Sequence, residues 1–237
     1  MLVRVSLSSA CVLTLSSCVA LFITAGVRGD AKGPVKVVCF GDSITEGYRI
    51  TDAFTTPYPD MLRKMLDEKK GKGGFEVVNA GVSGQDTHQG LARVDEVLRK
   101  EKPDWMLILY GTNDLWSTRK MAVSDTDRNL RAIVTKAKAA GAKCIIGTII
   151  PVWDFDAKVS ERNESIRKIA NDEGIGLVDM NAAFEKAVKA AGGRAGKAAW
   201  EKYYQVEEGG FVHPNDAGNR LIAEKWFEAL DEAPAAK

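Results

Sequence analysis

Short apolar segments alternate with longer amphipathic ones along most of this 237-residue chain, and this alternation restricts the fold more than any other feature. Five short segments, rich in branched residues, are expected to be strands buried on both faces: residues 35–40, 75–79, 105–110, 144–150 and 176–179. Five longer segments have apolar positions three and four residues apart, as amphipathic helices do: residues 57–69, 89–100, 125–140, 159–172 and 216–230. Such alternation predicts an α/β fold with a five-stranded parallel sheet in a three-layer α/β/α arrangement.

The same alternation predicts where a functional site lies, because open parallel sheets bind ligands beyond the carboxyl ends of their strands. Polar motifs follow three predicted strands directly, in residues 41–47, 79–84 and 111–114, and a fourth motif, residues 211–216, precedes the last helix. Any one of them is explained as a turn or a helix cap, since Gly, Ser, Asn and Asp are the usual turn residues. Four of them in this order predict a site at this edge of the sheet.

The N-terminus has the pattern of a secretory signal peptide. Arg4 precedes an apolar and small-residue run over residues 5–25, and polar residues follow. We therefore expect a signal peptide in residues 1–31 and an exported domain in residues 32–237, periplasmic or extracellular and without stable membrane association. Two alternatives stay open: an uncleaved membrane anchor, or a lipoprotein anchored at Cys18, which ends a lipobox-like Leu-Ser-Ser-Cys.

Composition excludes several other classes of protein. The formal net charge is +1, so no basic field indicates a nucleic-acid partner. Cys39 and Cys144 lie within predicted strands and are expected to be small core residues, although export would permit a disulfide. With two histidines and no CxxC motif, the chain is not expected to hold zinc. We predict neither a metal nor an organic cofactor.

Ser43 and His213 are the candidate catalytic residues. Ser43 lies in the motif Gly-Asp-Ser-Ile-Thr-Glu-Gly after the first predicted strand, where a tight turn can present its hydroxyl at the rim of the sheet. Serine is a weak nucleophile near neutral pH and needs a base within hydrogen-bond reach. Histidine suits this role because its unperturbed pKa is about 6.5, and His213 lies in the last motif.

Four further polar residues near the motifs have structural explanations. Asp42 and Asp114 adjoin motif residues and are expected to cap turns and brace loops, as is Glu46 at the following helix. His88 is expected to be a polar residue near the start of the predicted helix over residues 89–100.

From about residue 35 to residue 230, the motifs resemble those of the SGNH hydrolases, also called GDSL esterases and lipases. Gly-Asp-Ser43 is similar to the family's nucleophile block, and His213-Pro-Asn is similar to its base block. Residues 82–94 look particularly like the secreted arylesterase and lysophospholipase branch. The resemblance implies a flavodoxin-like fold, with Ser43 as the nucleophile and His213 as its general base.

The resemblance also implies an oxyanion hole formed by the backbone N–H groups of Ser43 and Gly84 and the side-chain amide of Asn113. Ester hydrolysis puts negative charge on the former carbonyl oxygen, and each donor aimed there is worth about 100- to 1000-fold in rate. Glycine permits close approach of the backbone, and asparagine donates without titrating.

One position departs from the family pattern. The family usually has an aspartate three residues before the base histidine, and in this chain that position is Gly210. Glu207 and Glu208 lie slightly earlier, and we favour Glu208 because it is nearer to His213 and directly precedes a glycine pair. Two alternatives stay open: a Ser–His dyad whose ring is oriented by a backbone carbonyl, or glutamates that are only solvated surface charges.

The predicted function is that of a secreted carboxylic ester hydrolase that forms an acyl-serine intermediate on small esters or O-acyl groups. One alternative is a polysaccharide or sialate O-acetylesterase, and another is an inactive descendant that binds glycans or acyl chains. The substrate, a small-molecule or glycan ester, is the predicted partner. The long segment 192–210 carries Trp200, Tyr203 and Tyr204, which would either form a wall of the site or pack against the body.

Overall fold

The structure is a computed structural model that describes residues 33–48, 56–193, 195–208 and 210–232. The predicted signal peptide, residues 1–31, and the candidate lipidation site Cys18 lie outside these residues. Within the described part of the chain, no helix is long and apolar enough to cross a membrane.

A parallel sheet of five strands has the order β2-β1-β3-β4-β5. The strands are β1 (Val35–Gly41), β2 (Phe75–Gly81), β3 (Trp105–Leu109), β4 (Lys143–Gly147) and β5 (Gly176–Val178). Gly41 at the end of β1 is paired with Gly81 of β2 and Leu109 of β3, so these three strands end together. The order is that of flavodoxin-like folds, in which the connections diverge between β1 and β3 and leave a crevice for ligands. The predicted five-stranded parallel sheet is confirmed.

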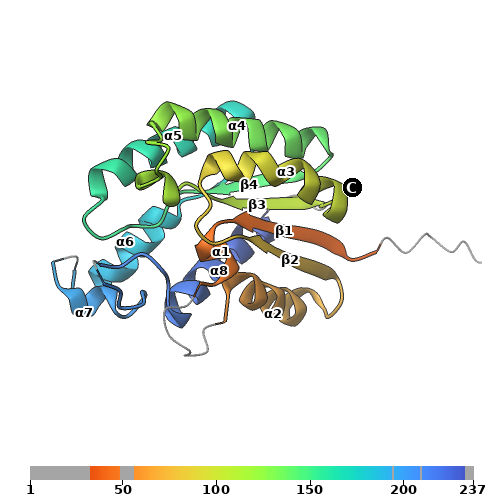
Figure 1. Cartoon of the computed structure of the whole chain (residues 1–237). Coiled ribbons are helices and arrows are strands. Elements are labelled where there is room, and N and C mark those ends of the chain that lie inside the picture. Colours follow the sequence, from red (N-terminus) through yellow and green to blue (C-terminus); the bar gives the residue numbers. More distant parts are fainter. Residues whose placement is uncertain (1–32, 49–55, 194, 209, 233–237) are drawn as a thin grey trace, which may run out of the picture. The chain divides into compact units, whose positions relative to one another are not determined.

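Helices cover both faces of the sheet (Figure 1). On one face lie α3 (Thr87–Glu101), α4 (Val123–Ala139) and α5 (Asp156–Glu173), and on the other lie α2 (Tyr58–Lys70), α6 (Met180–Ala190) and α8 (Asp216–Glu232). Successive side chains of a strand point to opposite faces. Val37 and Cys39 therefore join the core against α2, α6 and α8, whereas Val38 and Phe40 join the core against the other three helices. The predicted three-layer arrangement is confirmed.

Strand β4 ends at Gly147, earlier than the sequence predicts, although the apolar segment of the sequence continues past this residue. The N–H of Thr148 donates to the Val178 carbonyl at 3.1 Å, and the Asn163 side chain bonds both backbone groups of Ile149 at 2.7 and 2.9 Å. Buried backbone groups need such partners, and a side chain of α5 supplies them here in place of a strand.

Three helices were not anticipated from the sequence, namely α6 and the short α1 (Ser43–Glu46) and α7 (Lys197–Trp200). Within segment 192–210, Trp200 and Tyr204 are each 1% exposed and pack with Phe211, so their role is packing against the body. Cys39 and Cys144 are buried free thiols, as expected for core residues.

Candidate active site

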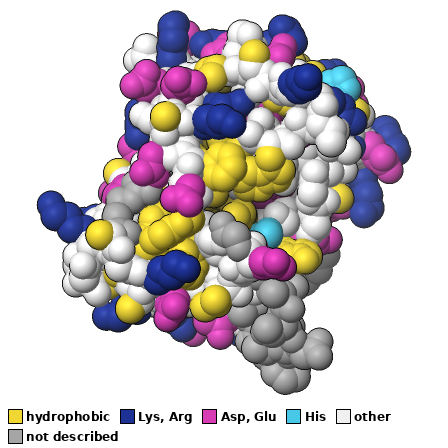
Figure 2. Space-filling view, turned by 60° about the vertical axis from the view of Figure 1, so that its left-hand side comes forward, with side chains coloured by type: hydrophobic (Ala, Val, Ile, Leu, Met, Phe, Trp, Pro, Cys, Tyr) yellow, Lys and Arg dark blue, Asp and Glu magenta, His cyan; other side chains and the backbone are white. Residues whose placement is uncertain are grey.

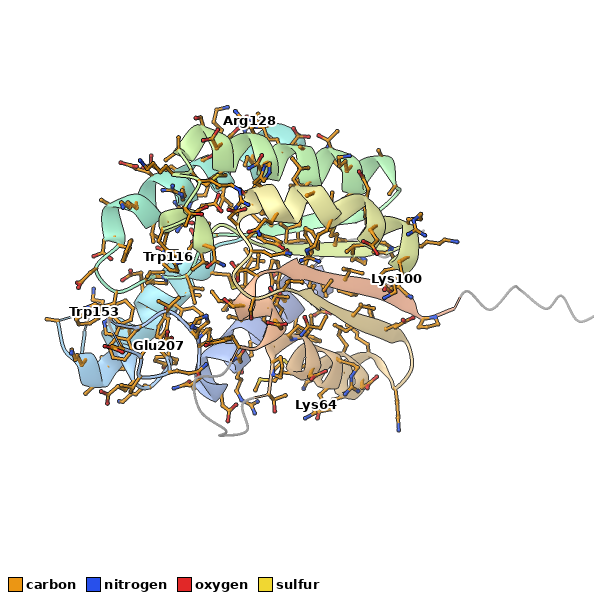
Figure 3. All side chains as sticks on the ribbon, in the orientation of Figure 1. Lys64, Lys100, Trp116, Arg128, Trp153 and Glu207 are labelled. Carbon is orange, nitrogen blue, oxygen red and sulfur yellow. The ribbon has the colours of Figure 1, made fainter. Side chains whose placement is uncertain are left out.

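The polar motifs meet in a pocket of about 520 Å³ at the carboxyl ends of the strands. Its lining consists of Ser43, Tyr48, Ser83, Gly84, Asn113, Trp116, Glu207, Glu208 and His213. In Figure 3, Trp116 and Glu207 lie toward this end of the sheet, whereas Lys100 lies near the opposite end. Another cavity, of about 590 Å³, lies where β3 and β4 begin, and none of the motif residues lines it.

Ser43 is presented by a tight turn between β1 and α1. It is the first residue of α1, and the Asp42 side chain caps this helix by accepting a hydrogen bond from the Ile44 N–H at 3.0 Å. Gly41 has no room for a side chain, because a Cβ there would overlap the side chain of Thr45. The turn leaves Ser43 only 6% exposed, at the wall of the pocket.

His213 lies next to Ser43, although 170 positions separate them in the sequence. Its Nε2 is 2.9 Å from the Ser43 Oγ. The His213 carbonyl accepts the N–H of Gln205 at 2.8 Å, which fixes the loop that carries the histidine. The ring of Tyr48 packs on the imidazole with 4.6 Å between the ring centroids. The fold therefore brings the predicted nucleophile and base into hydrogen-bond reach.

The carboxylate beside His213 belongs to Glu207, and this corrects the choice of Glu208. The Glu207 oxygens lie 3.0 and 3.1 Å from Nδ1 of His213, and one of them also accepts the His213 backbone N–H at 2.7 Å. A carboxylate only accepts hydrogen bonds, so the proton is on Nδ1 and Nε2 accepts the Ser43 hydroxyl. Glu208 lines the pocket, but it is exposed.

The backbone explains why the carboxylate comes from Glu207. Glu207 and Gly210 form an isolated antiparallel bridge, and the Gly210 N–H donates to the Glu207 carbonyl at 3.3 Å. At Gly210 φ is +140°, and a Cβ would lie 3.0 Å from the Cβ of Trp153. A side chain is therefore strained and crowded at the position where the family carries its aspartate, and the residue across the bridge supplies the carboxylate.

Gly84 lies in a turn that follows β2. The Gln85 N–H donates to the Val82 carbonyl at 3.4 Å, and Gly84 has φ +75°, a conformation that glycine adopts without strain. Glu46 at the end of α1 holds this turn, because its carboxylate accepts the backbone N–H of Ser83 at 3.0 Å and the Ser83 hydroxyl. Helix α1 therefore fixes the glycine turn as well as the serine.

Asn113 begins a short 3₁₀ helix after β3 (Asn113–Leu115). Its side-chain amide donates one hydrogen bond to the carbonyl of Gln85 at 3.0 Å, immediately after Gly84 in the chain. An asparagine amide has two hydrogens, so the second is available to the pocket that Asn113 lines. Gly84 and Asn113, two of the three predicted oxyanion-hole residues, are thus in adjoining loops.

Asp114 holds the loop that carries Asn113 in place. Its buried carboxylate accepts the backbone N–H of Thr87 at 2.8 Å, and the hydroxyls of Thr87 and Thr126 each at 2.6 Å. These bonds tie the loop to α3 and α4, in agreement with the bracing role expected for Asp114.

Asp42 places a second carboxyl group near Ser43. Asp42 is 1% exposed, and its Oδ2 has no hydrogen-bond partner among the described residues. Burial raises the pKa of Asp42 to about 7, against the opposing effects of the hydrogen bond from Ile44 and the charge on His213. The Asp42 carboxyl group is therefore protonated and uncharged in most molecules below neutral pH.

Two pocket residues were not identified from the sequence. Tyr48 and Trp116 are large aromatic residues with 45% and 44% exposure, and the only sequence signal was their position shortly after Ser43 and Asn113. Figure 2 shows a face on which hydrophobic side chains lie beside a histidine and acidic side chains. The second histidine, His88, is exposed and does not line the pocket. The described residues contain no group of three or more His, Cys, Asp or Glu arranged to hold a metal ion.

Comparisons with known proteins agree with this fold. Residues 39–221 match the GDSL-like lipase/acylhydrolase family. An acetylxylan esterase of Geobacillus stearothermophilus is 26% identical over 215 residues, which cover 82% of this chain and 93% of that enzyme. The thioesterase 1/protease 1/lysophospholipase L1 of Escherichia coli K12 is 33% identical over 143 residues, which cover 60% of this chain and 64% of that enzyme. The crystal structure of TesA superimposes with a TM-score of 0.64 at 26% identity, covering 82% of this chain and 97% of TesA.

The family match includes all four polar motifs, from the serine turn to the histidine loop. The resemblance to the SGNH hydrolases is thereby confirmed. The chain belongs to the GDSL-like lipase/acylhydrolase family and is an enzyme of the carboxylic ester hydrolase class.

Proposed function

We propose that this enzyme uses Ser43 as a nucleophile, His213 as the general base and Glu207 as the group that orients the histidine. The supporting observation is the line of contacts from Glu207 to His213 at 3.0 Å and from His213 to Ser43 at 2.9 Å, which ends in the pocket. It favours an active enzyme over an inactive binding protein, because Glu207 supplies the carboxylate that Gly210 lacks.

In the first half-reaction, Oγ of Ser43 attacks the ester carbonyl carbon while Nε2 of His213 takes the hydroxyl proton. The bond between the acyl carbon and the alcohol oxygen then breaks, and Nε2 returns the proton to the leaving alcohol. Water reacts with the acyl-serine in the same way, giving its proton to Nε2, and Oγ leaves and recovers that proton. Glu207 stabilises the imidazolium formed in each half.

The oxyanion hole of this proposal consists of the backbone N–H groups of Ser43 and Gly84 and the side-chain amide of Asn113. All three residues line one pocket. The Ser43 N–H belongs to the first turn of α1, whose amides have no partner within the helix. Glu46 holds the turn that contains Gly84, and the Gln85 carbonyl holds the Asn113 amide, before the reaction begins, as catalysis by preorganised dipoles requires.

The pocket supports a short acyl group. Among the described lining residues, the only apolar surfaces are the rings of Tyr48 and Trp116, and no aliphatic side chain is present. Each buried methylene is worth roughly 0.8 kcal/mol. Among the described residues, a long acyl chain would have only these two rings against which to bury its methylenes, so we propose acetyl and other short acyl esters as substrates.

A polysaccharide O-acetylesterase is the second candidate. The acetylxylan esterase of Geobacillus stearothermophilus aligns over 93% of its own length, and its name describes an acetyl group on a sugar polymer. That acyl group agrees with the short-acyl site proposed here.

We also propose export with removal of residues 1–31, because the basic start and apolar run have the signal-peptide pattern.

The test is a chain-length profile. We expect kcat/KM for 4-nitrophenyl acetate to exceed that for the octanoate by about tenfold or more, and Ser43→Ala to remove both activities. A preference for octanoate would contradict the short-acyl proposal. Full activity of Ser43→Ala would contradict the proposed nucleophile.

A further inference from the structure

We infer that the alcohol half of the substrate is an uncharged sugar ring that stacks on the indole of Trp116. This inference rests on the proposed ester hydrolysis at Ser43 and adds the chemical class of the alcohol. Trp116 and Glu208 are its specificity-determining residues, and both line the pocket that contains Ser43.

Trp116 is an exposed ring held in a fixed position. It is 44% exposed, yet its backbone N–H donates to the Asn113 carbonyl at 3.3 Å, and its ring meets that of Phe155 at 5.4 Å and 72°. Edge-to-face contacts of this kind fix ring orientation. A large apolar ring that is both exposed and fixed is a preformed surface for a flat ligand.

The segment after Trp116 is also anchored. The Ser117 hydroxyl and the Arg119 guanidinium bind one carboxylate oxygen of Asp86, at 2.8 and 2.7 Å. Asp86 caps α3, so these bonds join the loop to the start of a long helix. This loop is therefore ordered before a ligand binds, and binding does not have to supply the free energy of ordering it.

The position of Trp116 selects the alcohol half of the ester. Asn113, whose amide is proposed to bind the carbonyl oxygen, lies three residues earlier and is bonded to Trp116 through the backbone. An ester bound at Asn113 therefore has its remaining atoms close to the indole. With a short acyl group, only the alcohol half is large enough to cover the ring.

The charges of the lining favour an uncharged alcohol. Of the residues described in the structure, the pocket is lined by Glu207 and Glu208 but by no lysine or arginine. An anionic alcohol, such as a uronate, a sialate or a phosphate ester, would be repelled by these carboxylates and would meet no lysine or arginine among the described lining residues. Sugars combine neutrality with ring faces of slightly positive C–H groups, which suit the negative face of an indole.

The first experiment tests stacking by Trp116. Substrates are a mono-acetylated methyl glucopyranoside and ethyl acetate, whose alcohol has no ring, and acetate release is measured for both. We expect Trp116→Ala to lower the ratio of kcat/KM for the sugar ester to that for ethyl acetate about fivefold to tenfold, mainly through KM. Trp116→Phe should retain most of the ratio. Leu177→Ala, an exposed apolar residue on β5 outside the pocket, is the matched control and should leave the ratio unchanged.

The second experiment tests the charge preference. The substrates are the acetylated methyl glucopyranoside and the matching acetylated glucuronoside, which differ by one carboxylate. We expect the wild type to prefer the neutral ester, and Glu208→Gln to reduce this preference about threefold at low salt. Glu224→Gln, an exposed glutamate on α8 outside the pocket, is the control and should change nothing.

The outcomes of these experiments distinguish the inferred sugar site at Trp116 from the proposed ester hydrolysis at Ser43. If acetate release depends on Ser43 but Trp116→Ala leaves the ratio unchanged, the stacking inference fails and the ester hydrolysis stands. A wild-type preference for the glucuronoside would overturn the uncharged alcohol. If the wild type hydrolyses neither the sugar ester nor ethyl acetate, both fall together.

Discussion

The Glu207 carboxylate binds His213 at two points, the backbone N–H at 2.7 Å and the ring Nδ1 at 3.0 Å. One residue therefore fixes both the loop that carries the imidazole and the tautomer of the ring. The two bonds explain how the histidine stays aligned with Ser43 although position 210 carries no acid.

The first prediction concerns the two glutamates. Glu207→Gln keeps the size of the side chain but removes the charge, so we expect kcat to fall by roughly 100- to 10,000-fold, up to the loss seen when the triad aspartate of a serine protease is changed to asparagine. Glu208→Gln should change kcat toward a small neutral ester less than about threefold. Steady-state kinetics on 4-nitrophenyl acetate measure both variants. A severe defect only in Glu208→Gln would identify Glu208 as the glutamate that orients His213.

The second prediction is that the family's own arrangement cannot be restored. Adding Gly210→Asp to Glu207→Gln should recover no activity, because the new Cβ would crowd Trp153 and position 210 has φ +140°. The double variant should also unfold at a lower temperature than Glu207→Gln alone. Recovery to within tenfold of wild type would show that position 210 accepts a catalytic acid.

The comparison of Glu207 with Glu208 shows where sequence reasoning succeeds and where it ends. Apolar runs were sufficient for the sheet and the layers, because burial and parallel topology determine them. The pairing of Ser43 with His213 was expected from the motifs and from the family resemblance, and the fold brings the two side chains to 2.9 Å. The acid depended on a backbone bridge and a contact with Trp153, which residue spacing does not reveal. Trp116 was missed for a related reason: an isolated tryptophan in a sequence is more often a core residue than an exposed surface.

The third prediction concerns Asn113. Its amide is proposed to stabilise charge that develops only in the transition state, so Asn113→Ala should lower kcat by about 100- to 1000-fold and change KM little. The amide also bonds the Gln85 carbonyl, so the melting temperature of the variant must be measured beside its kinetics. An unchanged kcat in a folded variant would leave Asn113 as a loop residue only.

The fourth prediction follows from the raised pKa of Asp42, which is about 7 in the fold. In the unfolded chain an aspartate has a pKa of about 3.9. The buried carboxyl therefore favours the fold most at low pH, and this advantage is lost as the pH rises toward about 7. Asp42→Asn keeps the helix cap and stays neutral. Its free energy of unfolding relative to wild type should rise between pH 4 and pH 7, by at most about 4 kcal/mol. Denaturant titrations that give a constant difference over this range would contradict the effect.

The fifth prediction concerns processing. Protein isolated from its native host should begin near Lys32, because the small residues before it fit a signal-peptidase site. N-terminal sequencing and intact mass measure this directly. A chain that begins at a lipid-bearing Cys18 would establish a lipoprotein instead, and an intact N-terminus would establish an uncleaved anchor.

The most direct test of the account is to identify the residue that becomes acylated. A fluorophosphonate probe reacts with serines activated by a neighbouring base, and mass spectrometry of the labelled protein locates the modified side chain. We predict one modification, on Ser43, that is lost in Ser43→Ala and strongly slowed in Glu207→Gln. Equal labelling of Ser43→Ala, or modification of another residue in the wild type, would contradict the proposal that Ser43 is the nucleophile.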